Sequence, residues 1–282
     1  SRGLEFELLQ ACDEGKDVSV IEDRIKQIMS LKEDDLQKEL LAGVVYDDIE
    51  LLSVAKSHKY QEPSDLEGIR SERPVAKIEG LRVPEEKVLF DRVYGAWLGR
   101  CAGCLLGKPF EGWYRDRMTG LLKATDNYPI NFYTSSEIAP EIAEKYEMAK
   151  ESHRAWINTV SYMPEDDDTN YTIIGLKIFE KYGENFTPED VAVSWLSDLP
   201  ILHTYTAERV AYRNFILGIK PPESASYRNP FREWIGAQIR ADFFGYVSPG
   251  DAERAAEYAW RDASISHVKN GIYGEMFVAA ML

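Results

Sequence analysis

The side chains best suited to chemistry form one acidic run, residues 165–168 (Glu-Asp-Asp-Asp), followed directly by Thr169. Adjacent carboxylates repel one another unless a cation lies among them. Asp and Thr are poor helix-interior residues but good N-caps, because their oxygens accept from the free N–H groups of a first turn. The apolar residues 173–179 then predict a helix. We therefore expect the carboxylates where a loop enters a buried helix.

This acidic run has two interpretations. Ligands that are all oxygen suit Mg²⁺, Mn²⁺ or Ca²⁺ rather than zinc. The alternative is a solvated acidic loop that contains one N-cap. Since the run abuts an apolar helix instead of a polar tract, both interpretations stay open on the residues alone.

A second segment, residues 85–106, predicts a long helix that places further groups. Glycine recurs in it at every fourth position, at Gly95, Gly99, Gly103 and Gly107. Each glycine costs a helix about 1 kcal/mol relative to alanine. Four on one stripe therefore predict that another backbone approaches closely. Cys101 and Cys104 have C-x-x-C spacing, but no second Cys or His pair accompanies them, so we interpret both as small core residues.

Two other segments carry candidate site residues. Glu111 lies on a short turn bounded by Pro109 and Gly112, where it offers one carboxylate to a pocket or is an ordinary exposed acid. His267 is either a structural histidine or a base. Tyr273 is flanked by glycines that admit a ligand or simply ease helix packing.

The composition bounds the function. The 282 residues are 44% hydrophobic and carry a net charge of −15, which argues against nucleic-acid or anionic-membrane binding as the main task. Three cysteines make no disulfide framework and fit a reducing compartment. We see no signal peptide and no apolar stretch suited to span a bilayer, so we expect a cytoplasmic protein.

Helical spacing predominates and alternating strand patterns are almost absent, which predicts an all-α fold. We expect an N-terminal helical module at 1–60, a proline-rich extended connector at 61–84 and a main helical domain at 85–282. The module either packs on the main domain or binds a partner. Helix starts are well marked at 187–190 (Thr-Pro-Glu-Asp) and 248–251 (Ser-Pro-Gly-Asp).

Together these pieces resemble the ADP-ribosylglycohydrolase family, which includes the dinitrogenase reductase-activating glycohydrolases. The resemblance covers roughly residues 88–282. Its matching features are the glycine-striped helix, Gly107-x-Pro109-x-Glu111, the Asp-Asp-Thr element at 167–169, and Ser266-His267.

The resemblance implies a metal-dependent glycosidic-bond hydrolase with an all-α fold. Its substrate would be an ADP-ribosyl or related ribosyl small molecule, or an ADP-ribosylated protein. Glu111 would be a mobile acid near the scissile bond and, with Asp167, a catalytic group. The metal ligands that it implies, for one or two Mg²⁺ ions with Mn²⁺ as a substitute, are Asp166, Asp167, Asp168 and Thr169. The catalytic groups that it implies are Glu111 and Asp167. The substrate-binding residues that it implies are His267, Asn270 and Tyr273.

The chain departs from the family pattern at three places. The family helix commonly reads Gly-Asp where this chain has Gly103-Cys104, and Asp166 replaces a hydroxyl residue. The second metal motif, Asp-x-Asp-Thr, is missing after Thr169. We therefore expect that a segment beyond Leu282 or a companion chain supplies it. The alternative is a catalytically degenerate module that binds ADP-ribose or a nucleotide, or a structural interaction module.

Overall fold

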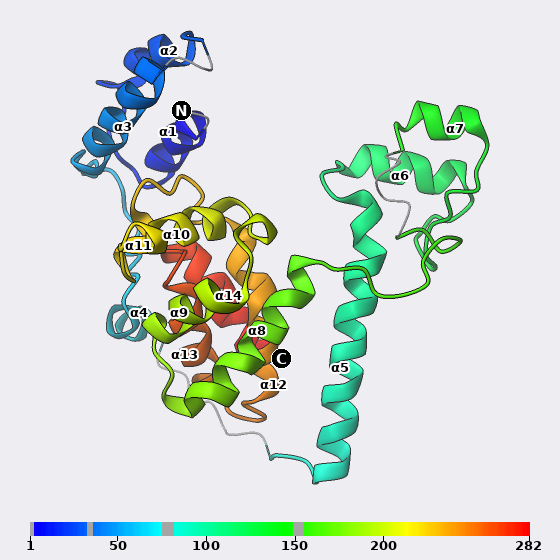
Figure 1. The fold of residues 1–282 in the computed structure, drawn as a ribbon. Coiled ribbons are helices and arrows are strands. Elements are labelled where there is room, and N and C mark those ends of the chain that lie inside the picture. Colours follow the sequence, from blue (N-terminus) through cyan, green and yellow to red (C-terminus); the bar gives the residue numbers. More distant parts are fainter. Residues whose placement is uncertain (1–2, 33–35, 75–81, 149–154) are drawn as a thin grey trace. The chain divides into compact units, whose positions relative to one another are not determined.

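The computed structural model describes residues 3–32, 36–74, 82–148 and 155–282 (Figure 1). Its regular elements are helices, and among the described residues the one β contact is an isolated bridge between Lys16 and Val54. The all-α prediction is confirmed. The chain divides into two compact units, residues 83–170 and residues 1–82 together with 171–282. No helix in the described part of the chain combines the length and apolarity needed to cross a bilayer.

The smaller unit is built on one long helix. It contains α5 (Glu86–Gly107), the 3₁₀ turn η1 (Lys108–Phe110), α6 (Arg115–Ala124) and α7 (Pro140–Lys145). Phe110, Leu121 and Leu122 form its core. Within this unit, a Cβ at any of the four glycines of α5 would meet no described atom within 4 Å. The close packing expected along the glycine stripe therefore stays a prediction.

The larger unit contains all remaining helices. These are α1 (Leu4–Asp13), α2 (Glu22–Met29), α3 (Leu36–Glu50), α4 (Leu66–Glu72), α8 (Asp167–Tyr182, whose first turn belongs to the smaller unit), α9 (Pro188–Asp198), α10 (Thr206–Ile216), α11 (Glu223–Ser226), α12 (Ala241–Tyr246), α13 (Ala252–Ala263) and α14 (Lys269–Met281), with 3₁₀ turns η3 (Gly183–Asn185), η4 (Ile201–His203) and η5 (Ile235–Arg240).

Helices α13 and α14 make the most extensive contact in this unit. Small side chains on α13 permit it, since Ala255, Ala259 and Ala263 are all buried. Both start signals read from the sequence are confirmed. Thr187 forms a capping box at α9, and the Asp251 carboxylate accepts from the N–H of Arg254 at the start of α13.

The N-terminal helices have a small core of their own and also dock on the rest of the larger unit. Arg232 lies between two acids of the first helical segment, with Nη1 2.9 Å from Glu7 Oε2 and Nε 2.8 Å from Glu14 Oε1. All three side chains are under 10% exposed. The N-terminal helices therefore pack on the rest of the larger unit, and partner binding by the module stays a prediction.

The connector is not extended throughout, which corrects the expectation. Asp65 caps helix α4 by accepting from the N–H of Gly68 at 2.7 Å. Arg70 of this helix then donates to Glu253 and Glu257 of α13, at 3.1 and 2.8 Å. The helix forms because these contacts support seven residues that are too few to be stable alone. Residues 75–81 of the predicted connector lie outside the described residues.

A buried charge cluster crosses the centre of the larger unit. Arg240, only 1% exposed, contacts Asp262 (Nε to Oδ2, 2.5 Å), Glu208 (3.2 Å) and Glu275 (3.5 Å). Three carboxylates thus face one guanidinium. Burial, and next the charge of Asp262, raise the pKa of Glu275 well above its ordinary value. Burial therefore favours the neutral form of Glu275.

Candidate active site

The acidic run opens helix α8, as expected. The Asp166 carboxylate accepts from the N–H of Asp168 at 3.1 Å, and its carbonyl accepts from the N–H groups of Thr169 and Asn170 at 3.2 and 3.0 Å. Asp166 is therefore the residue that caps the helix. The adjacent Asp167 and Asp168 follow in the first turn, where the helix dipole favours negative charge.

Three residues of α5 and the turn after it face this corner. Arg100, Cys104 and Lys108 recur at every fourth position, which puts them on one side of a continuous helical path. Arg100 donates to the carbonyl of Asp168, with Nη2 at 2.6 Å and Nε at 3.2 Å. The Lys108 ammonium pairs with the Asp166 carboxylate. The chain thus brings two cations to its own acidic run.

These contacts divide the carboxylates into two kinds. Although burial opposes it, the hydrogen bond and charge of Lys108 hold the pKa of Asp166 below its ordinary value. No described residue supplies such a cation to Asp167. Burial and the negative charges of Asp166 and Asp168 raise the pKa of Asp167 to about 7. The corner therefore carries uncompensated negative charge, which a bound cation would relieve.

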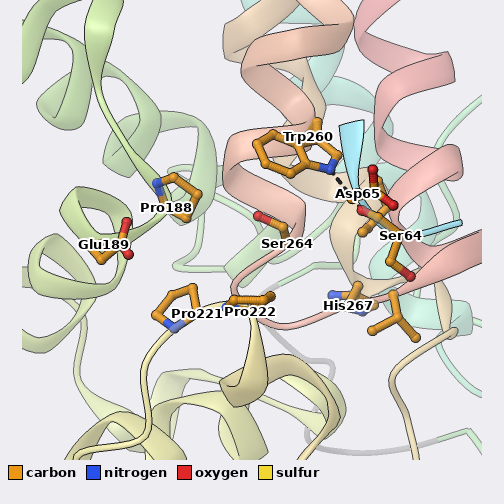
Figure 2. Close-up of a pocket in the computed structure, with 11 residues that line it drawn as sticks. Ser64, Asp65, Pro188, Glu189, Pro221, Pro222, Trp260, Ser264 and His267 are labelled. Atoms are coloured by element: carbon orange, nitrogen blue, oxygen red, sulfur yellow. Dashed lines mark hydrogen bonds between the residues drawn. The ribbon is translucent and has the colours of Figure 1, made fainter. Parts of the chain in front are cut away.

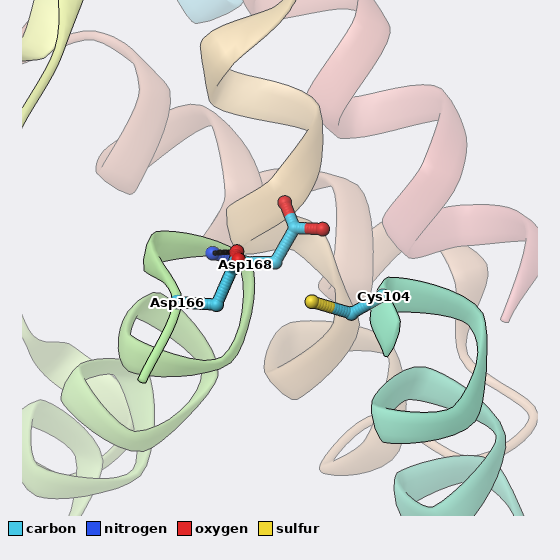
Figure 3. A group of neighbouring side chains, drawn as sticks. All are labelled: Cys104, Asp166 and Asp168. Carbon is cyan, nitrogen blue, oxygen red and sulfur yellow. Dashed lines mark hydrogen bonds between the residues drawn. The ribbon is translucent and has the colours of Figure 1, made fainter. Parts of the chain in front are cut away.

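The geometry also supplies a set of donor atoms suited to a metal ion. The Cys104 sulfur and one carboxylate oxygen each of Asp166 and Asp168 lie within 4.8 Å of one another. Figure 3 shows the sulfur pointing from α5 toward the start of α8. Two carboxylates and a thiol fit a divalent ion. The Thr169 hydroxyl donates to the carbonyl of Asp166 at 3.1 Å, and its role as a ligand stays a prediction, as does that of Asp167.

Glu111 lies on the turn that the sequence predicts. It directly follows η1, and Gly112 after it has a left-handed backbone with φ of 74°. Its side chain is exposed, and its charge acts on Lys108, the partner of Asp166. A carboxylate on an exposed turn is free to meet a substrate. Its catalytic role stays a prediction.

His267, Asn270 and Tyr273 belong to the larger unit. His267 is fully buried, and burial together with the charge of Arg240 lowers its pKa well below the ordinary value. Its Nδ1 shares a hydrogen bond of 2.8 Å with the Ser266 hydroxyl, and its Nε2 has no hydrogen-bond partner among the described residues. A neutral, buried imidazole fits the structural interpretation better than the base.

His267 also lines a cavity of about 400 Å³ within the larger unit (Figure 2). Its wall is mainly apolar and includes Trp260, Pro221 and Pro222. The indole N–H of Trp260 donates to the carbonyl of Ser64 at 2.9 Å, which ties this wall to the connector. The cavity has the size and apolar character of a small-molecule site, so a ligand role near His267 stays a prediction.

The side chains of Asn270 and Tyr273 both donate hydrogen bonds within the larger unit. The Asn270 amide donates to Glu233 at 2.8 Å, and the Tyr273 hydroxyl donates to the carbonyl of Pro63 at 2.5 Å. The glycines beside Tyr273 serve packing. A Cβ at Gly271 would lie 2.9 Å from the Arg232 carbonyl oxygen, and one at Gly274 would lie 2.5 Å from a side-chain nitrogen of Gln238.

The sequence interpretation missed Arg100, Cys104 and Lys108. Cys104 is half-buried and hydrogen-bonded to Asp166. The three residues share a spacing of four, which aligns two cations and a thiol on one helix face, but the sequence alone does not show the acids that they face.

The family model described as ADP-ribosylglycohydrolase matches residues 85–282, more than half of the chain. The curated proteins and the solved structures give no match. The matched range contains α5, the Glu111 turn and the start of α8, all of which were identified from the residues. By this match the chain belongs to the ADP-ribosylglycohydrolase family, a family of glycoside-cleaving hydrolases.

Proposed function

We propose that this protein is a metal-dependent hydrolase of the bond between an ADP-ribosyl group, or a related ribosyl group, and its acceptor. The acceptor is a small molecule or a protein. The observation that carries the proposal is the crowding of Asp166, Asp167 and Asp168 at the start of α8, inside the range that matches the family. We further propose the cytoplasm as its compartment, on the content of three free cysteines.

Asp166 and Asp168 would hold the metal, with Mg²⁺ as the ion that the family resemblance implies and Mn²⁺ as a substitute. When bound, the ion would supply a Lewis acid that orients ribose hydroxyls and lowers the pKa of a bound water. The chain lacks the Asp-x-Asp-Thr motif after Thr169. We propose that the missing carboxylates come from a further segment or a companion chain.

We assign to the carboxylates of the smaller unit both the stabilisation of positive charge in the transition state and the proton transfers. Cleavage of a ribosyl C1 bond builds oxocarbenium-like positive charge, which nearby carboxylates stabilise. Asp167 is the carboxyl that we assign to proton transfer at the corner. Glu111, exposed on its turn, would orient the substrate or protonate the leaving group.

A second candidate function is favoured by one contact. Lys108 already neutralises Asp166, in the position where a metal ion would act. A chain that uses this lysine in place of a metal would bind ADP-ribose or a nucleotide without turnover. Calorimetric binding of ADP-ribose, unaffected by chelator and without product release from any ADP-ribosylated substrate, would favour this candidate.

The primary test is product release by the chain together with the further segment or companion chain that supplies the missing carboxylates. Incubation with a panel of N- and O-linked ADP-ribosylated proteins and small ADP-ribosides should release free ADP-ribose or ribose in the presence of Mg²⁺ or Mn²⁺. Chelation with EDTA should stop the release, and added metal should restore it. Release that continues unchanged in EDTA would contradict the metal-dependent mechanism.

Glu111→Gln should reduce turnover at least about 10²-fold, as expected for loss of a positioned acid–base group. The melting temperature should stay nearly unchanged, because an exposed turn residue contributes little to the core. Glu137→Gln, which alters another exposed acid of the same unit, is the matched control and should leave turnover intact. Equal rates for both variants would place the catalytic acid elsewhere.

A further inference from the structure

The thiol of Cys104 lies at the acidic corner. Its sulfur and carboxylate oxygens of Asp166 and Asp168 lie within 4.8 Å of one another (Figure 3). The charged groups that act on the thiol are these two carboxylates and, one helical turn later, Lys108.

The free protein holds this group as a thiol. Burial, followed by the charges of Asp166 and Asp168, raises the pKa of Cys104 to about 12. A metal ion that binds a thiol deprotonates it.

The donor set differs in kind from a magnesium site. Mg²⁺ prefers oxygen ligands, whereas thiolate selects softer ions such as Zn²⁺. Three protein donors are the number that catalytic zinc sites use. Cys104, Asp166 and Asp168 make such a trio, with sulfur as one member.

We propose that Cys104 is a metal ligand and that it shifts the preference of this corner from Mg²⁺ toward a softer divalent transition ion, typified by Zn²⁺. On binding, the Cys104 S–H bond breaks, its proton leaves to solvent, and a sulfur–metal bond forms. Lys108 keeps its own proton and moves away from Asp166. The inference rests on the proposed function in that it requires a divalent cation at this corner.

Cobalt is the probe for the test, because it substitutes for zinc and gives a sulfur-to-metal charge-transfer absorption in the near ultraviolet. The full chain is titrated with Co²⁺ under reducing conditions as wild type, Cys104→Ser and Cys104→Asp, with Cys101→Ser and Cys12→Ser as matched controls. Competition with Zn²⁺ and Mg²⁺ then gives the relative affinities. Melting curves establish that every variant is folded.

Wild type and both control variants should show the absorption, and Cys104→Ser should lack it. Zn²⁺ affinity should fall at least about tenfold in Cys104→Ser, the scale on which changes at a metal site act. Cys104→Asp should bind Mg²⁺ more tightly than wild type does, since it restores an all-oxygen corner.

The failures can be told apart. Calorimetric binding of Mg²⁺ or Co²⁺ by wild type without the sulfur absorption would overturn the role of Cys104 and leave the proposed function standing. Absence of binding of any of the three ions would overturn both. An absorption that persists in Cys104→Ser would assign the sulfur to another cysteine and would also overturn the proposal.

Discussion

Replacing Arg240 by methionine is expected to destabilise the larger unit by about 3–5 kcal/mol, the usual result of removing one partner from a buried ion cluster. The substitution keeps an unbranched side chain of similar length but removes the guanidinium that pairs with Asp262 and Glu208. Both are under 5% exposed, so water cannot replace the guanidinium. They must then take up protons or force the core to open.

Urea unfolding followed by tryptophan fluorescence measures this loss, and Trp195 is a convenient probe because its ring lies 5.0 Å from the Arg240 guanidinium carbon. Arg228→Met is the matched control. It breaks an ion pair with Asp47 whose side chains are 33% and 55% exposed, and should cost no more than about 1 kcal/mol. Equal losses for the two variants would show that the buried cluster contributes no more than a surface pair.

Asp168→Asn is expected to lower kcat/KM about 10³-fold, equivalent to about 4 kcal/mol of transition-state stabilisation. The substitution removes the charge of one proposed metal ligand from the corner. Arg100 donates to the backbone carbonyl of Asp168, a contact that asparagine retains, whereas the ion pair of 3.8 Å between Arg100 and the Asp168 carboxylate is lost. A pair this long contributes little, so removal of one of two like charges that crowd Asp167 should still raise the melting temperature.

Opposite movement of activity and stability is the diagnostic result, because a purely structural carboxylate would lose both together. The assay combines ADP-ribose release, Mg²⁺ titration and thermal melting on the same preparations. Glu165→Gln, which alters the exposed acid before the helix cap, is the control and should change none of these quantities appreciably. Retained metal binding and turnover in Asp168→Asn would remove this residue from the metal set.

The parts of the fold that could be predicted are those whose signals are local in sequence. A capping side chain acts within one turn, so the starts of α9 and α13 followed from four residues each. Helix α4 was missed because only seven residues form it and its support comes from α13, far along the chain. The Arg240 cluster likewise draws its carboxylates from α10, α13 and α14, and no local pattern links them.

The candidate site divides in the same way. The acidic run could be identified from the sequence because four consecutive carboxylates have no ordinary packing role. Its place at the start of α8 followed from the capping preferences of Asp and Thr. The role of Cys104 depended on a contact across 62 positions of sequence, from residue 104 to residue 166. A single thiol in a glycine-rich helix carries no sign of that partner. The spacing shared with Arg100 and Lys108 is informative only once the acids opposite are known.

The N-terminal helices dock on the rest of the larger unit through Arg232, and this contact limits where the chain can be truncated. The range that matches the family begins at residue 85, yet the compact unit that contains most of it also includes residues 1–82. A fragment that begins at residue 85 would lose Glu7 and Glu14, the two carboxylates that pair with Arg232. It would also lose the helix whose Arg70 contacts α13. The range that matches the family, residues 85–282, and the compact unit that the chain forms therefore differ, and the matched range alone lacks part of that unit.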